Sequence, residues 1–363
     1  MKRVLCITAN MNRGGAETFL MKVYRNLDLS KYQMDFCVNA ENNVYSNEIN
    51  SYGGKIFKIP SKSKHPIKSF ISIYNIVKNN NYDYVMRVNE HSLSVIDLIA
   101  ARMGGAKKVI MRSSNSSSGG NISTILHKIF KFLPKHIPDV MIAPSSLAAQ
   151  YTFGSKNLAN DKVNILNNGV DLDVFNYSFN NRTEIRREFD LSNKFIVGHI
   201  GRFNTQKNHD FLLEIFSDIL KIKENSVLFM VGEGNLLEHT KEKAKEMGIL
   251  DNCIFAGHRD DVFKILSAMD VFILPSFYEG MPNVIIEAQA TGLPCLISDT
   301  ITSEANITGL VNYLSLSEDS SLWAEEAINL YKDERLDTKD IFLKKEYDID
   351  SVTNKFLDLV FED

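Results

Sequence analysis

The chain has 363 residues, of which 44% are hydrophobic and 24% are charged, a composition typical of soluble globular proteins. At roughly 150 residues per domain, this length indicates about two domains. The composition excludes a disordered chain, a collagen-like chain and a small disulfide-bonded protein.

Charge is distributed unevenly along the chain. Residues 1–171 contain 22 Lys and Arg against 11 Asp and Glu, whereas residues 172–363 contain 19 against 34. The two halves therefore carry net charges of +11 and −15. This asymmetry favours two units with different partners, the basic one facing an anionic membrane or a phosphate. Surface charge that serves no partner is the alternative interpretation.

The positions of the cysteines and the lengths of the apolar runs indicate in which cellular compartment the protein is expected. The four cysteines are far apart, and each lies in an apolar run: Cys6, Cys37, Cys253 and Cys295. This pattern predicts buried free thiols in a reducing compartment. The apolar run near the N-terminus is too short for a signal peptide, and no stretch approaches the roughly 20 apolar residues of a membrane span. We expect a cytoplasmic protein and leave open a peripheral contact with the inner face of the cytoplasmic membrane.

Short β-branched runs alternate with amphipathic stretches through the first half. Strands are predicted at 4–9, 33–40, 55–60, 82–89, 108–114, 139–145 and 163–169. Helices are predicted at 16–26, 67–78, 92–103 and 122–132. This alternation indicates βαβ units and a parallel sheet covered by helices.

The second half repeats the alternation after a polar, turn-rich segment, 176–193, which we interpret as a domain junction. Strands are predicted at 195–202, 226–234, 253–258, 271–276 and 294–298, with helices near 208–223, 235–248, 261–269, 283–291 and 321–332. We therefore expect an α/β protein with two Rossmann-like doubly wound domains, 1–175 and 194–350, and a C-terminal helix, 351–363, near the junction. Ligands of such sheets bind at the carboxyl ends of the strands, so the site is expected in the cleft between the domains.

The most informative local pattern is PSFYEGMPNVIIEA at residues 275–288. A buried strand is expected to end before a loop with Glu279 and Gly280, and a helix to begin near Pro282. The unpaired N–H groups of such a helix start suit a phosphate, and Gly280 lets a ligand approach the backbone. Glu279 and Glu287 would then bind sugar hydroxyls. In the alternative interpretation they are a loop acid and an exposed helix acid.

The segment GRFNTQKNHD at residues 201–210 supports the same interpretation. The strand before it brings Gly201 and Arg202 to the rim of the expected cleft, and Lys207 precedes the next helix. Arginine offers a planar fork and lysine a mobile point charge, a pair that suits a diphosphate. Solvated cations on the rim are the alternative.

Gly14 and Gly15 follow the first predicted strand, so backbone N–H groups there can approach a phosphate or a sugar. Glycines in an ordinary strand-to-helix turn are the alternative. The G-x-G-x-x-G fingerprint is absent here, and GEGNLL at 232–237 lacks its third glycine, which disfavours a nicotinamide-dependent enzyme. No His, Cys or Asp cluster has the spacing of metal ligands, so no metal is expected.

Three further polar residues follow predicted strands of the first half: His91, Arg112 and Asn115. His91 is placed to donate a hydrogen bond to a substrate hydroxyl, or to serve as a structural cap. Arg112 and Asn115 are placed to meet an acceptor, or to belong to a mobile serine-rich loop. The segment HKIFKFLPKH at 127–136 mixes basic and aromatic residues, as at an anionic membrane surface or in an amphipathic core helix.

Together these features resemble the GT-B fold retaining glycosyltransferases of family 4, the glycosyl transferases group 1 type of bacterial capsular polysaccharide and exopolysaccharide biosynthesis. The resemblance covers nearly the whole chain. It rests on the E-x7-E element from Glu279 to Glu287, on GRFNTQKN, on NNGVDLDVF at 167–175 and on the N-terminal GGAE. It implies transfer of a sugar from a nucleotide-diphosphate donor to an acceptor hydroxyl, with retention of configuration.

The resemblance also implies residue roles. His91, Glu279, Arg202 and Lys207 are the implied catalytic residues, with the two cations neutralising the diphosphate. The implied donor-binding residues are Gly14, Gly15, Gly201, Arg202, Lys207, Gly257, His258, Arg259, Glu279, Gly280, Met281, Pro282, Asn283, Val284 and Glu287. Among these, Glu279 would hold the donor sugar, Glu287 the ribose and the segment 257–259 the base. Arg112 and Asn115 would lie on the acceptor side.

The implied partners are a nucleotide-diphosphate sugar carried on UDP or GDP, a lipid-linked or oligosaccharide acceptor, and an anionic membrane surface contacted through 61–68 and 127–136. Neither nucleic acid nor a metal cofactor is expected, because cations and helix N–H groups can stabilise the leaving diphosphate. Two alternatives stay open: a nucleotide-sugar 2-epimerase of the same fold, and a non-catalytic sugar-binding protein.

The chain departs from the family pattern at two places. After Asp299, many members carry a Gly-Gly-x-x-Glu segment, where this chain reads ITSEANITGLVNYLSL and offers Glu304 as the replacement acid. At 111–115, MRSSN replaces a His-rich segment.

Overall fold

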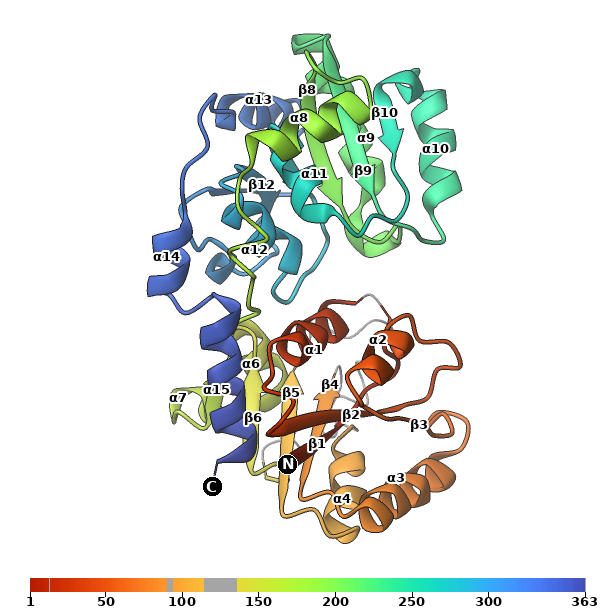
Figure 1. Cartoon of the computed structure of the whole chain (residues 1–363). Helices are drawn as coiled ribbons and strands as arrows, with labels where there is room; N and C mark the ends of the chain where they lie inside the picture. The colour runs from red at the N-terminus through yellow and green to blue at the C-terminus, as the bar shows by residue number, and fades with distance from the viewer. Residues whose placement is uncertain (13, 90–93, 114–135, 363) are drawn as a thin grey trace. The chain divides into compact units, whose positions relative to one another are not determined.

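The computed structural model describes residues 1–12, 14–89, 94–113 and 136–362 (Figure 1). The chain forms two compact units. Unit 1 consists of Met1–Gly169 with Ile349–Asp363, and unit 2 consists of Val170–Asp348. No helix in the described part of the chain combines the length and the apolar character needed to cross a membrane.

Unit 1 is built on a seven-stranded sheet with the order β3-β2-β1-β4-β5-β6-β7. Its strands are β1 (Lys2–Ile7), β2 (Tyr32–Val38), β3 (Ile56–Lys58), β4 (Tyr84–Asn89), β5 (Lys108–Ser113), β6 (Val140–Ala143) and β7 (Val163–Ile165). All their ladders are parallel; Val4 of β1, for example, pairs with Met34 on one side and Tyr84 on the other.

Helices cover both faces of the unit 1 sheet. They are α1 (Gly15–Arg25), α2 (Ser46–Ser51), α3 (Pro66–Asn80), α4 (Val95–Met103), α6 (Ser146–Phe153), α7 (Ser155–Ala159) and α15 (Ile349–Phe361). Val4 of β1 packs in one core with α1 and α15, while its neighbour Leu5 packs in the other with α3, α4 and α6. Burial of both faces explains why these strands are continuously apolar.

Unit 2 repeats the design with the six-stranded sheet β10-β9-β8-β11-β12-β13, again all parallel. Its strands are β8 (Phe195–Ile200), β9 (Ser226–Val231), β10 (Cys253–Phe255), β11 (Val271–Leu274), β12 (Cys295–Ser298) and β13 (Val311–Leu314). Its α-helices are α8 (Phe179–Glu188), α9 (His209–Ile222), α10 (Leu237–Glu246), α11 (Val262–Ala268), α12 (Asn283–Ala290), α13 (Ser320–Leu330) and α14 (Lys339–Lys344), and its short 3-10 turns are η3 (Thr205–Lys207), η4 (Leu250–Asn252) and η5 (Ser303–Ala305).

Both sheets have the doubly wound order in which the chain first adds strands on one side of the initial strand and then on the other. The order reverses between β1 and β4 in unit 1, and between β8 and β11 in unit 2. Ligands of open parallel sheets bind outside the carboxyl ends of the strands at this reversal. In unit 2, the loops that follow β8 and β11 therefore lie at the expected ligand position.

Every predicted strand is confirmed, as are the predicted helices within the described residues; the helix predicted at 122–132 lies outside them. The structure adds β13, α2, α6, α7 and α14 to the prediction. The interpretation of 176–193 as a junction differs most, because this segment contains α8, which belongs to unit 2. The units divide instead at Gly169–Val170 and Asp348–Ile349.

Two side chains explain why the polar segment 176–193 folds onto unit 2. Arg182 and Arg186 of α8 each place Nη2 2.7 Å from a carboxylate oxygen of Asp270, which is only 4% exposed. The same carboxylate accepts a hydrogen bond from the backbone N–H of Ile196 at 2.7 Å. A buried carboxylate thus anchors a helix that has little apolar surface of its own.

The predicted free thiols are found. Cys6, Cys37 and Cys295 are buried and Cys253 is partly buried, and all four are free. Burial raises the pKa of the Cys37 thiol and that of Cys253 to about 12. These thiols are therefore protonated and unreactive at neutral pH.

Candidate functional site

The loops that follow β8 and β11 are joined to each other at the reversal of the unit 2 sheet. The backbone N–H of Phe277 donates to the carbonyl of Gln206 at 2.9 Å, and Gln206 Nε2 donates to the carbonyl of Tyr278 at 2.8 Å. Lys207 Nζ lies 2.7 Å from Glu279 Oε1. Two of the four predicted catalytic residues, 72 positions apart in the chain, thus form one ion pair.

The backbone around Lys207 is held by local hydrogen bonds. Asn204 caps the turn η3, because its Oδ1 accepts the N–H of Lys207 at 3.3 Å. Asn208 then adopts the left-handed conformation, with φ 54°, and α9 begins at the next residue. This sequence of turns sets the direction in which the Lys207 side chain leaves the backbone.

Gly201 provides the space that Lys207 occupies. A Cβ at Gly201 would lie 3.0 Å from Lys207 Cε and 3.2 Å from His199 Nε2. Those separations are at the lower limit of real contacts, so a larger residue would displace the lysine. Gly201 therefore lets Lys207 lie over the end of β8, and its role in donor binding stays a prediction.

The ion pair is largely withdrawn from water. The side chain of Lys207 is 14% exposed and that of Glu279 is 11% exposed. A shielded pair of this kind costs desolvation, and removing one partner leaves an uncompensated charge. Arg202, by contrast, is exposed. The site thus presents one preorganised cation and one accessible cation.

Two histidines beneath this pair were not predicted from the sequence. His199 and His209 are 0% and 3% exposed, their rings pack edge to face with centroids 4.9 Å apart, and Phe203 stacks on His209 at 4.2 Å. Burial, reinforced by the positive charge of Lys207, lowers the pKa of His209 to about 4. Burial, with His209 alongside, holds the pKa of His199 well below its usual value. Both imidazoles are therefore neutral at physiological pH. Lys207 consequently faces uncharged rings, not additional cations.

The helix that follows Glu279 begins one residue later than its proline. Pro282 is the N-cap of α12, so the helix starts at Asn283. Met281 is 6% exposed and Gly280 is also buried, so this loop is packed against the unit. Glu287 is 9% exposed. The interpretation of Glu287 as an exposed helix acid is therefore wrong.

Glycines bring the ends of β8, β9 and β10 into close contact. Gly232, with φ 141°, lies so near the Gly201 carbonyl that a Cβ would overlap it. The N–H of Gly232 donates to the carbonyl of Gly257 at 2.8 Å, and that of Gly201 donates to Val231 at 3.0 Å. Gly257 itself has φ 65°. The predicted donor residues Gly201 and Gly257 therefore lie on adjoining loops of one edge.

The side chains that follow Gly257 are engaged in salt bridges. Arg259 binds Glu188 of α8 at 2.6 Å and Asp261 at 2.8 Å. Its hydrogen bonds hold the pKa of Asp261 below the usual value. His258 Nε2 lies 3.0 Å from Asp260. Arg259, which the resemblance implies for the base, is therefore already paired with two carboxylates.

Arg112 of β5, predicted to lie on the acceptor side, is a buried residue of unit 1. Arg112 is 1% exposed; its Nη2 donates to Asn168 Oδ1 at 2.7 Å, and its guanidinium lies 3.7 Å from the centroid of the Phe19 ring. Burial lowers its pKa to about 9, although the charge of Glu17 opposes that shift. The structure therefore places Arg112 inside the unit, where it supports the loop 167–169. His91, Asn115 and residues 127–135 lie outside the described residues.

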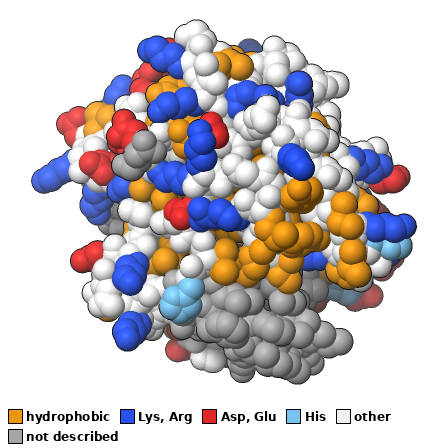
Figure 2. All heavy atoms as spheres, turned by 90° about the horizontal axis from the view of Figure 1, so that it is seen from below, with side chains coloured by type: hydrophobic (Ala, Val, Ile, Leu, Met, Phe, Trp, Pro, Cys, Tyr) orange, Lys and Arg blue, Asp and Glu red, His pale blue; other side chains and the backbone are white. Residues whose placement is uncertain are grey.

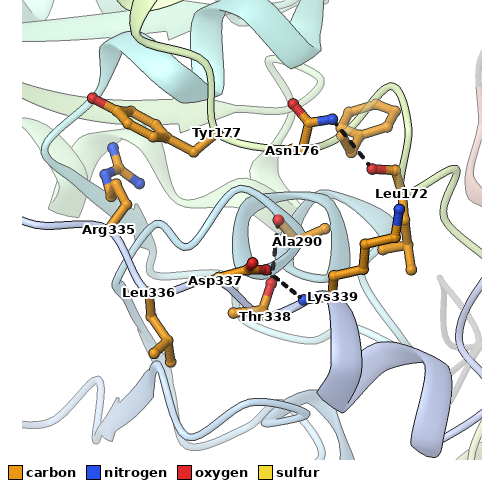
Figure 3. Close-up of a pocket in the computed structure, with 10 residues that line it drawn as sticks. Leu172, Asn176, Tyr177, Ala290, Arg335, Leu336, Asp337, Thr338 and Lys339 are labelled. Carbon is orange, nitrogen blue, oxygen red and sulfur yellow. Dashed lines mark hydrogen bonds between the residues drawn. The ribbon is translucent and has the colours of Figure 1, made fainter.

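A separate hollow of about 260 Å³ lies in unit 2 (Figure 3). It is lined by the segments 172–177 and 335–339 with Ala290. Two of its polar side chains bond to backbone carbonyls: Thr338 Oγ1 donates to that of Ala290 at 3.2 Å, and Asn176 Nδ2 to that of Leu172 at 3.4 Å. The buried Nη1 of Arg335, by contrast, has no hydrogen-bond partner among the described residues. None of the predicted site residues lines it. Among the described residues, no group of three His, Cys, Asp or Glu is placed to hold a metal ion.

Comparisons with known proteins bear on the family and the fold. The family model of glycosyl transferases group 1 matches residues 194–333. EpsF of Bacillus subtilis, named as a glycosyltransferase, is 34% identical over 331 residues, which are 89% of this chain and 86% of EpsF. The UDP-Gal:alpha-D-GlcNAc-diphosphoundecaprenol alpha-1,3-galactosyltransferase of Escherichia coli is 29% identical over 240 residues, 64% of this chain and 62% of that enzyme.

The fold comparison covers both units. The crystal structure of Anabaena HepE in complex with UDP and glucose has a TM-score of 0.81 to this chain, over 99% of each, at 15% sequence identity. Two doubly wound parallel domains of this kind define the GT-B class of glycosyltransferases. The chain belongs to the glycosyl transferases group 1 family.

Proposed function

We propose that this glycosyltransferase transfers a sugar from a UDP-sugar to a hydroxyl of a lipid-linked saccharide, with retention of configuration, during assembly of a bacterial surface polysaccharide such as a capsule or exopolysaccharide. The Lys207–Glu279 pair at the β8/β11 reversal carries this proposal, because it places a held cation beside a carboxylate where such folds bind ligands. The name of the Escherichia coli relative, with its UDP-linked donor and diphosphoundecaprenol-linked acceptor, supports the choice of substrates.

Charge development defines the proposed mechanism. As the bond between the sugar and the diphosphate breaks, negative charge grows on the leaving phosphate oxygen. Lys207, Arg202 and the first N–H groups of α12 would stabilise that charge, and preorganised groups of this kind lower the barrier most. The acceptor hydroxyl would attack from the face that the diphosphate leaves, giving its proton to the leaving phosphate oxygen. Retention of configuration follows from this geometry.

Glu279 and Glu287 have distinct proposed roles. Glu279, held by Lys207, would accept hydrogen bonds from hydroxyls of the donor sugar. Glu287, one turn inside α12 and nearly buried, would accept those of the ribose. Separating the Glu279 carboxylate from Lys207 on donor binding would cost free energy. We therefore propose that Glu279 keeps its contact with Lys207 in the complex.

Nucleotide binding gives the first test. Addition of UDP, GDP, ADP or CMP at a concentration about 100 times the Kd stabilises a binding protein by about 2.7 kcal/mol. We expect UDP to raise the Tm, and Lys207→Ala to reduce that increase. The matched control is Lys221→Ala, since Lys221 is an exposed lysine of α9 whose side chain is 72% exposed. A larger Tm increase with GDP than with UDP would indicate that the donor is a GDP-sugar.

Transfer assays with UDP-sugars and undecaprenyl-diphosphate-linked acceptors give the second test. We expect Lys207→Ala to lower kcat by about 100-fold or more, the effect of removing one group that stabilises transition-state charge. Glu279→Gln should raise KM for the donor. Full activity in both variants would refute the site. Conversion of the donor epimer without an acceptor would instead indicate the 2-epimerase.

The proposed reaction needs no metal, because protein cations and helix N–H groups supply the positive charge. We expect EDTA to leave the activity unchanged. Loss of activity in EDTA that a divalent cation restores would refute a metal-independent reaction. A lipid-linked acceptor also implies that the enzyme works at the inner face of the cytoplasmic membrane.

A further inference from the structure

The hollow in unit 2 is formed by the two segments through which the chain enters and leaves that unit (Figure 3). The segment 172–177 follows the boundary at Gly169–Val170, and the segment 335–339 leads into α14, before the boundary at Asp348–Ile349. Its volume of about 260 Å³ is many times what one buried water needs, and it is smaller than the pockets that take drug-sized ligands. The hollow therefore has the size for a small organic molecule.

Half of the wall of this hollow is apolar. Five of the ten residues that line it are aliphatic or aromatic: Leu172, Phe175, Tyr177, Ala290 and Leu336. Tyr177 is 38% exposed and Leu336 is 49% exposed, so these two side chains remain open to a ligand. Pockets that bind small molecules combine apolar walls with a few polar groups that fix the orientation of the ligand. An occupant of this hollow would therefore need an apolar or aromatic part.

Arg335 brings a hydrogen-bond donor without a partner to this wall. Its Nη2 donates to the carbonyl of Met269, whereas its buried Nη1 has no acceptor in the part of the chain that the structure describes. The guanidinium carbon lies 5.5 Å from the centroid of the Tyr177 ring, and Figure 3 shows both side chains on the same side of the hollow. Burial lowers the pKa of Arg335 to about 10, so the group is still charged at neutral pH. Buried donors are nearly always paired in folded proteins, so this N–H is suited to an acceptor that a ligand supplies.

The carboxylate that influences Arg335 already serves other arginines. Asp270 accepts from Arg182 and from Arg186 at 2.7 Å each, and Arg182 also donates to the Met269 carbonyl at 3.2 Å. On the face shown in Figure 2, Lys and Arg side chains lie at the surface, where water solvates them. The arginines near Asp270, by contrast, are largely withdrawn from water. Three guanidinium groups thus gather about one buried carboxylate, and an added anion would compensate the excess of positive charge.

Lys339 adds a cation on the other side of the hollow (Figure 3). Its Nζ lies 3.2 Å from Asp173 Oδ1, but the two side chains are 55% and 89% exposed. Exposed pairs of this kind contribute little to stability, so Lys339 can turn to another anion at low cost. Asp337, the acidic residue of the wall, is engaged locally, because its Oδ1 accepts the backbone N–H of Lys339 at 3.0 Å. An anion in the hollow would therefore meet positive charge from two sides.

We propose that this hollow, formed by the segments 172–177 and 335–339 with Ala290 and here named the linker pocket, binds a small organic anion with an aromatic body, an aryl carboxylate or an aryl phosphate. The aromatic body would pack against Tyr177, and the anionic group would accept hydrogen bonds from Arg335 and Lys339. Rotation about the last bonds of the Arg335 side chain would turn Nη1 toward the ligand. The linker pocket would be a second site, apart from the donor site, and the inference does not depend on the proposed function.

Isothermal titration calorimetry with the full chain tests the proposal. The probes are phenyl phosphate, benzoate and the uncharged benzyl alcohol. We expect at least one of the two anions to bind at one site with a Kd below about 1 mM. Benzyl alcohol should bind at least about tenfold more weakly, because it lacks the charge that the arginine and the lysine recognise. The tighter of the two anions identifies the ligand as a phosphate or a carboxylate. Binding of neither anion, or equal binding of benzyl alcohol, would overturn the proposal.

Three single variants test the residues of the linker pocket. Arg335→Gln should weaken binding of the preferred anion by about tenfold or more, since a hydrogen bond between charged groups is lost. Lys339→Gln should weaken it by about two- to fivefold, as expected for an exposed cation. Tyr177→Leu should weaken it by about two- to tenfold through loss of the aromatic contact.

Folding of these variants needs its own measurement. Arg335 also bonds to the Met269 carbonyl, so Arg335→Gln is expected to lower the Tm. Lys339 and Tyr177 are exposed, so their variants should keep the Tm of the original chain. Unchanged affinity in both of these variants would overturn the proposal. The matched control is Lys344→Gln, which removes an exposed lysine of α14 that does not line the pocket. An equal loss of affinity in the control and in Lys339→Gln would also overturn it.

A final comparison separates the linker pocket from the donor site. Saturating UDP should leave the affinity for phenyl phosphate and benzoate unchanged, and so should Lys207→Ala. Competition by UDP, or loss of probe binding in Lys207→Ala, would place the probe at the donor site and overturn the proposal. Failure of UDP to bind, with probe binding that still depends on Arg335 and Lys339, would refute only the proposed function.

Discussion

Replacing Gly232 by alanine tests whether the loop from Gly201 to Lys207 depends on close packing of its backbone against Gly232. The residue has φ 141°, a conformation that L side chains rarely adopt. An added Cβ would overlap the Gly201 carbonyl oxygen and would lie 2.9 Å from its carbon. The obstacle is backbone and not a flexible side chain, so the loop that leads to Lys207 must move.

The cost follows from two terms. Holding alanine at a conformation suited only to glycine costs about 1–3 kcal/mol, and overpacking a filled site costs about another 1–3 kcal/mol. We therefore expect Gly232→Ala to lower the free energy of unfolding by about 2–6 kcal/mol. For a unit of this size, each kcal/mol corresponds to a decrease in Tm of about 2–4 °C.

Gly248→Ala is the matched control. Gly248 also has a positive φ, 71°, but no atom lies within 4 Å of its added Cβ. Only the conformational term of about 1–2 kcal/mol applies there. Differential scanning fluorimetry, with and without UDP, should show a larger loss of Tm and a smaller UDP-induced increase in Gly232→Ala. Equal losses in the two variants would refute the claim that contact with Gly201 matters.

Three further predictions concern other features. Asp270→Asn leaves two buried arginine contacts without a counter-charge and should cost about 3–5 kcal/mol in urea unfolding; a loss below about 1 kcal/mol would contradict this value. The pKa of His209 is about 4 in the folded protein against 6.5 unfolded, so the unfolded chain binds more protons between these values and stability falls as pH decreases. The free energy of unfolding should therefore fall by about 2 kcal/mol less between pH 7 and pH 5 in His209→Phe than in the original chain. An unchanged pH dependence would refute a neutral His209. Phe356→Ala should cost about 3–5 kcal/mol, because this fully buried ring joins α15 to the unit 1 core, and selective loss of protection in unit 2 by hydrogen exchange would contradict that assignment.

The sequence predicted what depends on local periodicity. Apolar strands that alternate with amphipathic helices indicated both doubly wound sheets, and the segments 201–210 and 275–288 were expected at strand ends, where the structure has them. The ion pair itself was beyond such reasoning, because Lys207 and Glu279 meet through sheet order and not through sequence spacing. The burial of His209 was hidden for a similar reason: its neighbours in sequence are polar, and its aromatic partners come from the end of β8 and the following loop.

Helix α8 was missed because its stabilising contacts are charged. Its buried residues are Ile185 and Arg186, so the sequence has no apolar stripe that would predict a helix. Its anchor, Asp270, is 84 residues away from Arg186. β13 was missed because Val311 is its one fully buried residue and Asn312 is exposed, so no continuous apolar run marks it. Such a strand takes its structure from pairing with β12, which the sequence pattern does not show.

The placement of α15 has a consequence for how the protein is made. Val352, Phe356 and Val360 fill the same core as β1 and α1, although more than 300 residues separate them from that strand. A nascent chain that has emerged as far as residue 169 has α1 on this face of its first sheet but still lacks the part of the core that α15 supplies. Unit 2 has all of its own strands and helices before α15 leaves the ribosome. The unit that begins synthesis first therefore completes its core last, and the part of that core awaiting α15 is the surface that chaperones would meet during translation.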